Sequence, residues 1–119
     1  MAKDTGTPKA YRPLNKLARV LDLFTTIIPT MPLGQIQAFI IVACNPDKSL
    51  GEIALLAKMR QSTLSRYLLD WSDKTRTGAP GYGLITRLSD PHELRRNMYA
   101  LSPLGILLAD QILQYLQGV

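Results

Sequence analysis

The segment QSTLSRYLLDW, residues 61–71, carries polar side chains at its start and bulky apolar side chains at its end. At helical spacing Leu64, Leu68 and Trp71 fall at positions i, i+4 and i+7 and share one face. The polar side chains on the other side, crowded near the helix N-terminus, are Gln61, Ser62, Ser65 and Arg66. The pattern predicts a helix that is anchored by its apolar face and offers hydrogen-bonding groups to a partner outside.

Length and charge narrow the possible partners. The chain has 119 residues, of which 46% are apolar, which suits one compact domain with a sizeable core. The net charge is +5, and it is uneven, because residues 1–19 and residues 58–96 each carry +4 while the rest sums to −3. Two basic zones fit a polyanion such as nucleic acid, although a solubilising surface remains the alternative.

Several classes of protein are not expected from the sequence. No apolar run approaches the roughly 20 residues of a membrane span, and the N-terminus has no secretory pattern, so a cytoplasmic location is expected. The single cysteine, Cys44, excludes an internal disulfide and is expected to be a buried thiol. With one histidine, no nucleophile paired with a base and no phosphate loop, we expect no enzyme, cofactor or metal site.

The order of the predicted elements indicates a fold. Residues 1–13 are interpreted as a flexible basic arm, and helical periodicity follows over residues 14–28 and again over residues 32–44. Ser49 and Glu52 have the spacing of a capping box, so a short helix begins there. The tight connection KMR then leads into the helix that starts at residue 61.

A hairpin follows this pair of helices. LITRLS and NMYALS alternate as strands do, and the six residues DPHELR join them. Two helices joined by a tight turn, with a polar face on the second and a hairpin after it, make a winged helix-turn-helix. The predicted fold class is therefore mainly α (α+β), in one domain over residues 14–119. Its parts are a helix-turn-helix at about 49–74, a two-stranded wing at about 84–102 and a C-terminal helix at about 103–118.

The C-terminal helix is apolar on two sides. One stripe can pack inside its own domain, whereas the second requires another partner. The two stripes are Leu104, Leu107, Leu108, Ile112, Tyr115 and Leu116, and Ile106, Ala109 and Leu113. We predict a homodimer held by this helix together with the N-terminal helix. The alternative is a helix sunk deeply in its own core.

The stretch from Leu33 to Gly105 resembles the MarR family of bacterial transcriptional regulators. The resemblance is carried by SLGEIALLAKMRQSTLSRYLLDW and by GLITRLSDPHELRRNMYALSPLG, in which the order and spacing of several short motifs match the family pattern. These motifs are Ser65-Arg66, Gly83-Leu84-Ile85-Thr86-Arg87, Asp90-Pro91, Glu93 with Arg95, and Leu101-Ser102 with Gly105. About 70 residues are covered.

The resemblance implies how the site is used. It implies that the recognition helix enters the DNA major groove with Ser62, Thr63, Ser65 and Arg66. It also implies that the wing arginine, Arg95, reaches the minor groove and is oriented by Glu93, where the family usually has aspartate. A narrow minor groove attracts a guanidinium because its negative potential is concentrated. Arg96 is then expected to contact the DNA backbone.

Two further departures from the family pattern bear on function. The insertion TRTGAPGY carries Arg76, which either follows a phosphate backbone or belongs to a loop without a role. The chain also has one C-terminal helix where the family has a longer dimerisation region. A small-molecule effector is possible on this resemblance, but no residue supports one.

The sequence thus predicts a dimeric, sequence-specific, double-stranded DNA-binding protein, most simply a transcriptional repressor on a palindromic operator. One alternative is a winged helix that binds DNA in replication or partition. Another is a protein-interaction adaptor without a DNA role.

Overall fold

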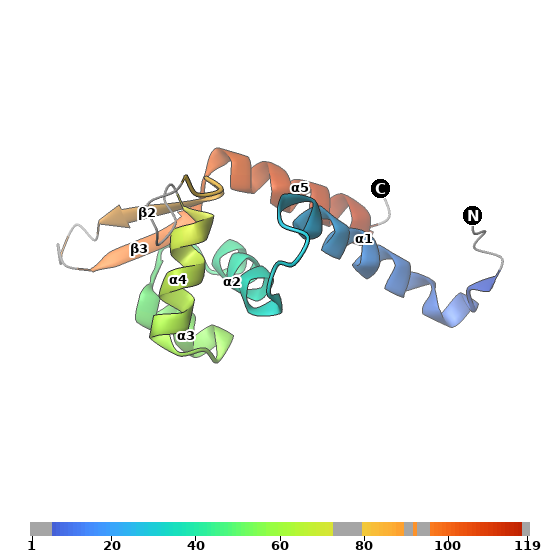
Figure 1. Cartoon of the computed structure of the whole chain (residues 1–119), viewed down its shortest axis with the longest axis horizontal. Helices are drawn as coiled ribbons and strands as arrows, with labels where there is room; N and C mark the ends of the chain where they lie inside the picture. Colours follow the sequence, from blue (N-terminus) through green and yellow to red (C-terminus); the bar gives the residue numbers. More distant parts are fainter. Residues whose placement is uncertain (1–5, 73–79, 90–91, 93–95, 118–119) are drawn as a thin grey trace. The chain divides into compact units, whose positions relative to one another are not determined.

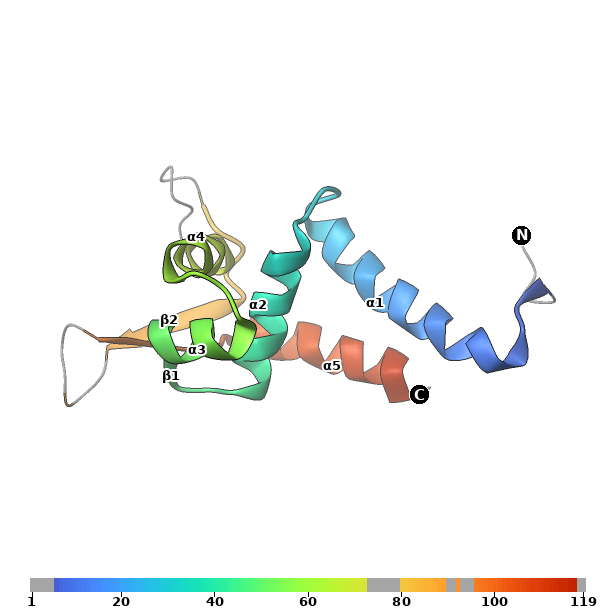
Figure 2. The ribbon, with the colours of Figure 1, turned by 90° about the horizontal axis from the view of Figure 1, so that it is seen from below.

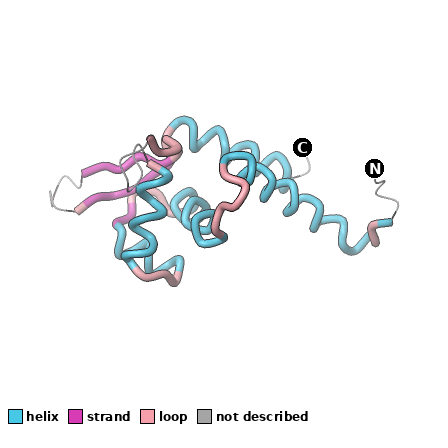
Figure 3. The backbone as a smooth tube through the Cα atoms, viewed as in Figure 1, coloured by secondary structure: helices cyan, strands magenta, loops and turns pink. Residues whose placement is uncertain are grey.

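The computed structural model describes residues 6–72, 80–89, 92 and 96–117 of the chain. Within these residues the structure is mainly helical, with one small antiparallel sheet (Figures 1 and 3). The helices are α1 (Arg12–Ile27), α2 (Leu33–Cys44), α3 (Leu50–Ala57), α4 (Gln61–Trp71) and α5 (Pro103–Gln117), preceded by a short 3-10 helix, η2 (Lys9–Tyr11). The strands are β1 (Lys48–Ser49), β2 (Ile85–Ser89) and β3 (Asn97–Leu101).

The chain divides into two compact units. One unit is residues 32–109, and the other is residues 1–31 with residues 110–119. The first holds the two helices of the helix-turn-helix, the hairpin and the helix that supports them. The predicted domain, residues 14–119, takes in all of this unit and most of the other.

The winged unit is built from α2, α3, α4 and the sheet. Helix α2 contacts α3, α4 and β3, and α3 contacts α4 (Figure 2). Strands β2 and β3 form the predicted hairpin, in register from Ile85 opposite Leu101 to Ser89 opposite Asn97. The predicted winged helix-turn-helix is therefore confirmed.

The sheet has one strand more than the sequence predicted. Strand β1 pairs antiparallel with β3, with Ser49 opposite Met98, so the strand order is β1-β3-β2. Two residues are too few to show the alternation by which a strand is recognised. The consequence is that the start of α3 is joined directly to the wing by backbone hydrogen bonds.

The core of the winged unit is centred on Trp71. Its ring lies 5.2 Å from that of Phe39 and 5.5 Å from that of Tyr82, between centroids. Its Nε1–H donates to the backbone carbonyl of Gln35 at 2.8 Å. Leu64 and Leu68 are also fully buried, as predicted for this face of α4. Each such side chain contributes about 1.5–3 kcal/mol by burial, so the apolar end of α4 is firmly anchored.

Helix α3 begins and ends as local rules require. Ser49 accepts the N–H of Glu52 and Glu52 accepts the N–H of Ser49, which confirms the capping box. The helix ends at Ala57, and the C-cap residue after it, Lys58, adopts the left-handed region with φ 57°. This conformation, usually taken by glycine, turns the chain sharply toward α4.

The motif Leu101-Ser102 with Gly105 joins the wing to α5. The N–H of Ser102 donates to the carbonyl of Leu84, and its hydroxyl donates to the carbonyl of Gly83. The same hydroxyl accepts the N–H of Gly105. A Cβ on Gly105 would lie 2.0 Å from the carbonyl oxygen of Leu84, so only glycine fits this approach.

The other unit contains α1. This helix begins at Arg12 after the 3-10 helix, slightly earlier than predicted, and ends at Ile27 ahead of Pro29. Val20 and Phe24 are buried, whereas Leu14 and Leu17 are exposed. Its apolar stripe is therefore buried only in the second half of the helix.

Two further predictions from the sequence concern membrane spans and Cys44. Among the described residues, no helix combines the length and apolar character that crossing a membrane requires. The prediction that Cys44 is buried was wrong, because Cys44 is exposed. It is the last residue of α2, beyond the buried positions that end at Val42.

Candidate nucleic-acid interface

The first turn of α4 presents polar groups to solvent. Gln61, Ser62 and Arg66 are exposed, and Thr63 and Ser65 are half-buried. The N-cap residue, Arg60, makes no side-chain capping hydrogen bond, and the first turn holds no acidic residue. The backbone N–H groups of a helix's first turn lack intrahelical acceptors and carry partial positive charge. This end of α4 is therefore suited to an anion or to hydrogen-bond acceptors.

Close packing on the other side fixes the direction of α4. A Cβ on Gly34, in the first turn of α2, would lie 2.9 Å from the Tyr67 ring and 3.5 Å from Met59. Glycine at this position lets the Tyr67 ring lie directly on the α2 backbone. Tyr67 thus packs between the two helices. Tyr82 packs on Trp71.

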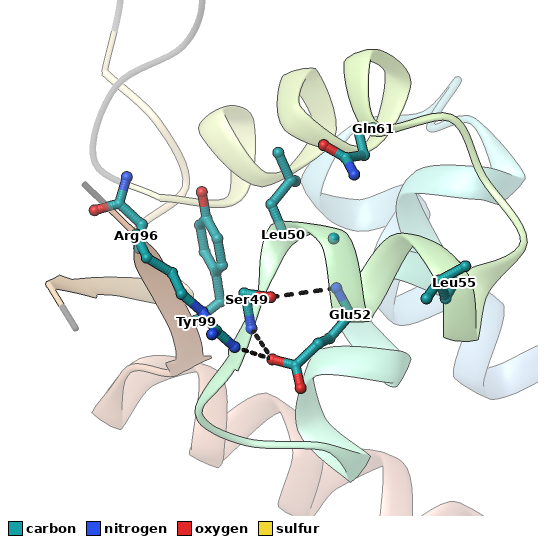
Figure 4. Close-up of a pocket in the computed structure, with 9 residues that line it drawn as sticks. Ser49, Leu50, Glu52, Leu55, Gln61, Arg96 and Tyr99 are labelled. Atoms are coloured by element: carbon teal, nitrogen blue, oxygen red, sulfur yellow. Dashed lines mark hydrogen bonds and ion pairs between the residues drawn. The ribbon is translucent and has the colours of Figure 1, made fainter. Parts of the chain in front are cut away.

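A groove separates the start of α4 from the base of the wing (Figure 4). Its volume is about 800 Å³. Gln61 of α4 and Arg96, the residue just before β3, line this groove together with Glu52 of α3. The described residues that line it are Ser49, Leu50, Gly51, Glu52, Leu55, Gln61, Arg96, Asn97 and Tyr99. Two of the predicted site residues, Gln61 and Arg96, thus line the same groove.

Arg96 forms an ion pair with Glu52. The Nη2 of Arg96 donates to Oε1 of Glu52 at 2.6 Å, and the same oxygen accepts the backbone N–H of Ser49 at 2.9 Å. Hydrogen bonds from Ser49 lower the pKa of Glu52 below its ordinary value of 4.5, with a smaller contribution from Arg96. The carboxylate is therefore charged near neutral pH. The sequence did not reveal this pair, because its members are 44 positions apart and form no local pattern.

The hairpin contributes another cation that the sequence prediction did not include. Arg87 lies on β2 opposite Tyr99 on β3 and is exposed. Burial raises the pKa of the Tyr99 hydroxyl, and the positive charge of Arg87, together with a hydrogen bond between the two side chains, partly opposes that rise. Arg87 is the arginine of the Gly83-Leu84-Ile85-Thr86-Arg87 motif. The sequence therefore singled it out only through the resemblance to the family.

Three predicted site residues lie outside the described residues: Arg76 in the insertion, and Glu93 and Arg95 in the wing. The Glu93–Arg95 brace and the phosphate contact of Arg76 therefore stay predictions. Within the described part of the chain, no three His, Cys, Asp or Glu side chains are grouped as a metal site.

Neither protein-family models nor curated proteins match the sequence. Solved structures do match the fold. The structure of RV1404 from Mycobacterium tuberculosis shares 20% identity at a TM-score of 0.69, covering 92% of this chain and 67% of that chain. A MarR-family transcriptional regulator from Silicibacter pomeroyi shares 21% identity at a TM-score of 0.59, covering 92% of this chain and 67% of that one.

A third solved structure contains DNA. The Staphylococcus aureus MepR–DNA complex shares 17% identity at a TM-score of 0.67, covering 92% of this chain and 79% of that chain. The similarity covers 92% of the chain at low identity, so it concerns the fold. The chain has the winged helix-turn-helix fold of MarR-family transcriptional regulators, as the sequence predicted.

Proposed function

We propose that this protein is a sequence-specific, double-stranded DNA-binding transcriptional regulator that represses by occupying a palindromic operator. The observation that carries the proposal is the orientation of α4. The apolar face of α4, formed by Leu64, Leu68 and Trp71, is buried. The polar residues of its first turns, among them Gln61 and Ser62, remain accessible. The fold it shares with a protein solved on DNA supports the same conclusion.

The proposed reading residues are those of the first two turns of α4. Hydroxyl, amide and guanidinium groups can hydrogen-bond to base edges in the major groove, and arginine can donate two hydrogen bonds to guanine. The uncapped helix N-terminus suits a phosphate. The proposed set in α4 is Gln61, Ser62, Thr63, Ser65 and Arg66. Arg76, Arg95 and Arg96 are the proposed backbone and minor-groove contacts, with Glu93 orienting Arg95.

A homodimer is part of the proposal. Helix α5 keeps six large apolar side chains exposed, which a monomer would leave in contact with water: Leu104, Ile106, Leu107, Leu113, Tyr115 and Leu116. Pairing two chains through such a face would remove this apolar area from water. It would also present two recognition helices about 34–36 Å apart, one turn of duplex DNA.

The dimer can be tested without disturbing the core. Leu107 is exposed, so Leu107→Glu should fold normally and sediment as a monomer. The matched control is Gln111→Glu, which adds the same charge at an exposed polar position of α5. Equal dimer fractions in wild type and Leu107→Glu would exclude α5 as the dimer interface.

The DNA-binding proposal is tested by selecting bound sequences from a random duplex pool and measuring affinity for the winner. Arg66→Ala should weaken binding to the selected site by about 1–3 kcal/mol if Arg66 reads a base. Arg66→Lys is the matched control, because it keeps the charge but loses the two-pronged donor geometry. A base-reading role predicts that lysine restores affinity for unrelated DNA but not the preference for the selected site.

The outcomes separate the three candidate functions. Selected palindromes at promoters support the repressor, and selected arrays of repeats would indicate a replication or partition role. Affinity for duplex DNA should fall steeply with added salt, since phosphate contacts release counterions. Absence of any salt-dependent binding would refute DNA recognition and favour the adaptor.

A further inference from the structure

One carboxylate oxygen of Glu52 accepts two hydrogen bonds from different parts of the fold. Its Oε1 accepts the backbone N–H of Ser49, which caps α3, and it also accepts Arg96 Nη2 from the base of the wing (Figure 4). Ser49 is itself held in the sheet by its pairing with Met98. The α3 cap and the backbone pairing of Ser49 therefore position the carboxylate independently of its ion pair with Arg96.

The ion pair lies in the groove between the wing and the proposed reading helix. Of the described residues that line this groove, Arg96 is the one basic and Glu52 the one acidic side chain. The two charges cancel, although each side chain stays about two-fifths exposed. A phosphate that approached Arg96 here would meet a guanidinium already engaged by a carboxylate.

We propose that Glu52 limits DNA affinity by competing with phosphate for Arg96. The inference rests on the proposed DNA-binding function. It assigns to Glu52 the role of weakening the contact between Arg96 and a DNA phosphate. Arg96 and phosphate form a sequence-independent contact, whereas α4 supplies sequence information. Glu52 therefore weakens binding to every duplex by a similar factor and keeps binding dependent on α4.

Glu52→Gln removes the competing charge and leaves the local structure intact. Glutamine at the third helical position also completes a capping box, so α3 should still begin at Ser49. Exposed ion pairs contribute little to stability, so unfolding should change only slightly. At 50 mM salt the variant should bind an unrelated duplex about 3- to 10-fold more tightly than wild type.

Salt dependence distinguishes this role from a structural one. One additional phosphate contact steepens the plot of log affinity against log salt by about 0.9. The gain from Glu52→Gln should therefore shrink about 3.5-fold between 50 and 200 mM salt. Asp110→Asn is the matched control, since it raises the net charge equally from an exposed position on α5.

A double-mutant cycle assigns the gain to Arg96. Arg96→Gln should weaken binding to duplex DNA less when Glu52 is present than when Glu52 is replaced by glutamine, because Glu52 already engages the guanidinium. In the Glu52→Gln protein the same substitution should cancel the gain. Unchanged affinity in Glu52→Gln, an equal gain in Asp110→Asn, or equal effects of Arg96→Gln in both backgrounds would each overturn the proposal. If wild type binds duplex DNA and one of these results is found, only this inference fails. A wild type that binds no duplex DNA overturns the proposed function, and the inference with it.

Discussion

Replacing Gly105 by alanine should damage the joint between the wing and α5. The added Cβ would lie 2.0 Å from the Leu84 carbonyl oxygen and 3.2 Å from the Leu101 Cβ. The Leu84 carbonyl must then move by about 1 Å, since carbon and oxygen do not approach so closely. That carbonyl accepts the N–H of Ser102 at 3.0 Å, and Ser102 in turn donates to Gly83 at 2.6 Å.

The magnitude follows from these contacts. Loss of two hydrogen bonds costs about 1–3 kcal/mol, and forcing a methyl group into a packed site costs about 1–3 kcal/mol. Alanine recovers up to about 1 kcal/mol through its higher helix propensity. We expect Gly105→Ala to lower the free energy of unfolding by about 3 kcal/mol. For a unit of this size the melting temperature should fall by roughly 12–24 °C.

The assay is urea unfolding followed by tryptophan fluorescence. Trp71 is the single tryptophan and lies in the core of the winged unit, so it reports on the part that Gly105 supports. The matched control is Gly51→Ala in α3, where the new Cβ would meet only the end of the flexible Gln61 side chain, at 3.3 Å. Gly51→Ala should change stability by about 1 kcal/mol or less. Equal unfolding midpoints for Gly105→Ala and Gly51→Ala would refute the close approach at Leu84.

Three further predictions concern stability. Lys58→Gly should raise the free energy of unfolding by about 0.5–1 kcal/mol in urea titrations, because φ at this position is 57°, whereas Lys58→Ala should give no gain. Trp71→Phe should lower it by about 2–4 kcal/mol, measured by circular dichroism, because a buried hydrogen bond to Gln35 is lost and a cavity is left. The pKa of Glu52 is lowered in the folded protein, so its stabilising effect is present above its ordinary pKa of 4.5 and is lost as the pH falls through the lower folded value. The small difference in urea midpoint between wild type and Glu52→Gln should therefore shrink as the pH falls below 4.5, and a difference that stays constant below that pH would contradict the assignment.

Features with a local physical cause were predictable from the sequence. Helix α3 begins directly after Ser49 because the capping box satisfies backbone groups within four residues. The buried face of α4 follows from helical spacing alone, and the hairpin from alternation around a short connection. The polar start of α4 was recognised in the same way, since the residues that face outward are those left over from the apolar stripe.

Features that join distant segments were decided by the tertiary structure. Strand β1 exists only because β3 pairs with it, and Arg96 meets Glu52 only after that pairing brings the wing to α3. Glycine at positions 34 and 105 was visible in the sequence, but the ring and the carbonyl that require it belong to other elements. Cys44 is exposed because the buried positions of α2 end at Val42, two residues before it, and only the packing of α2 in the folded chain sets that limit. Periodicity and capping act within a few residues, whereas close approach and charge pairing depend on distances that only the folded chain defines.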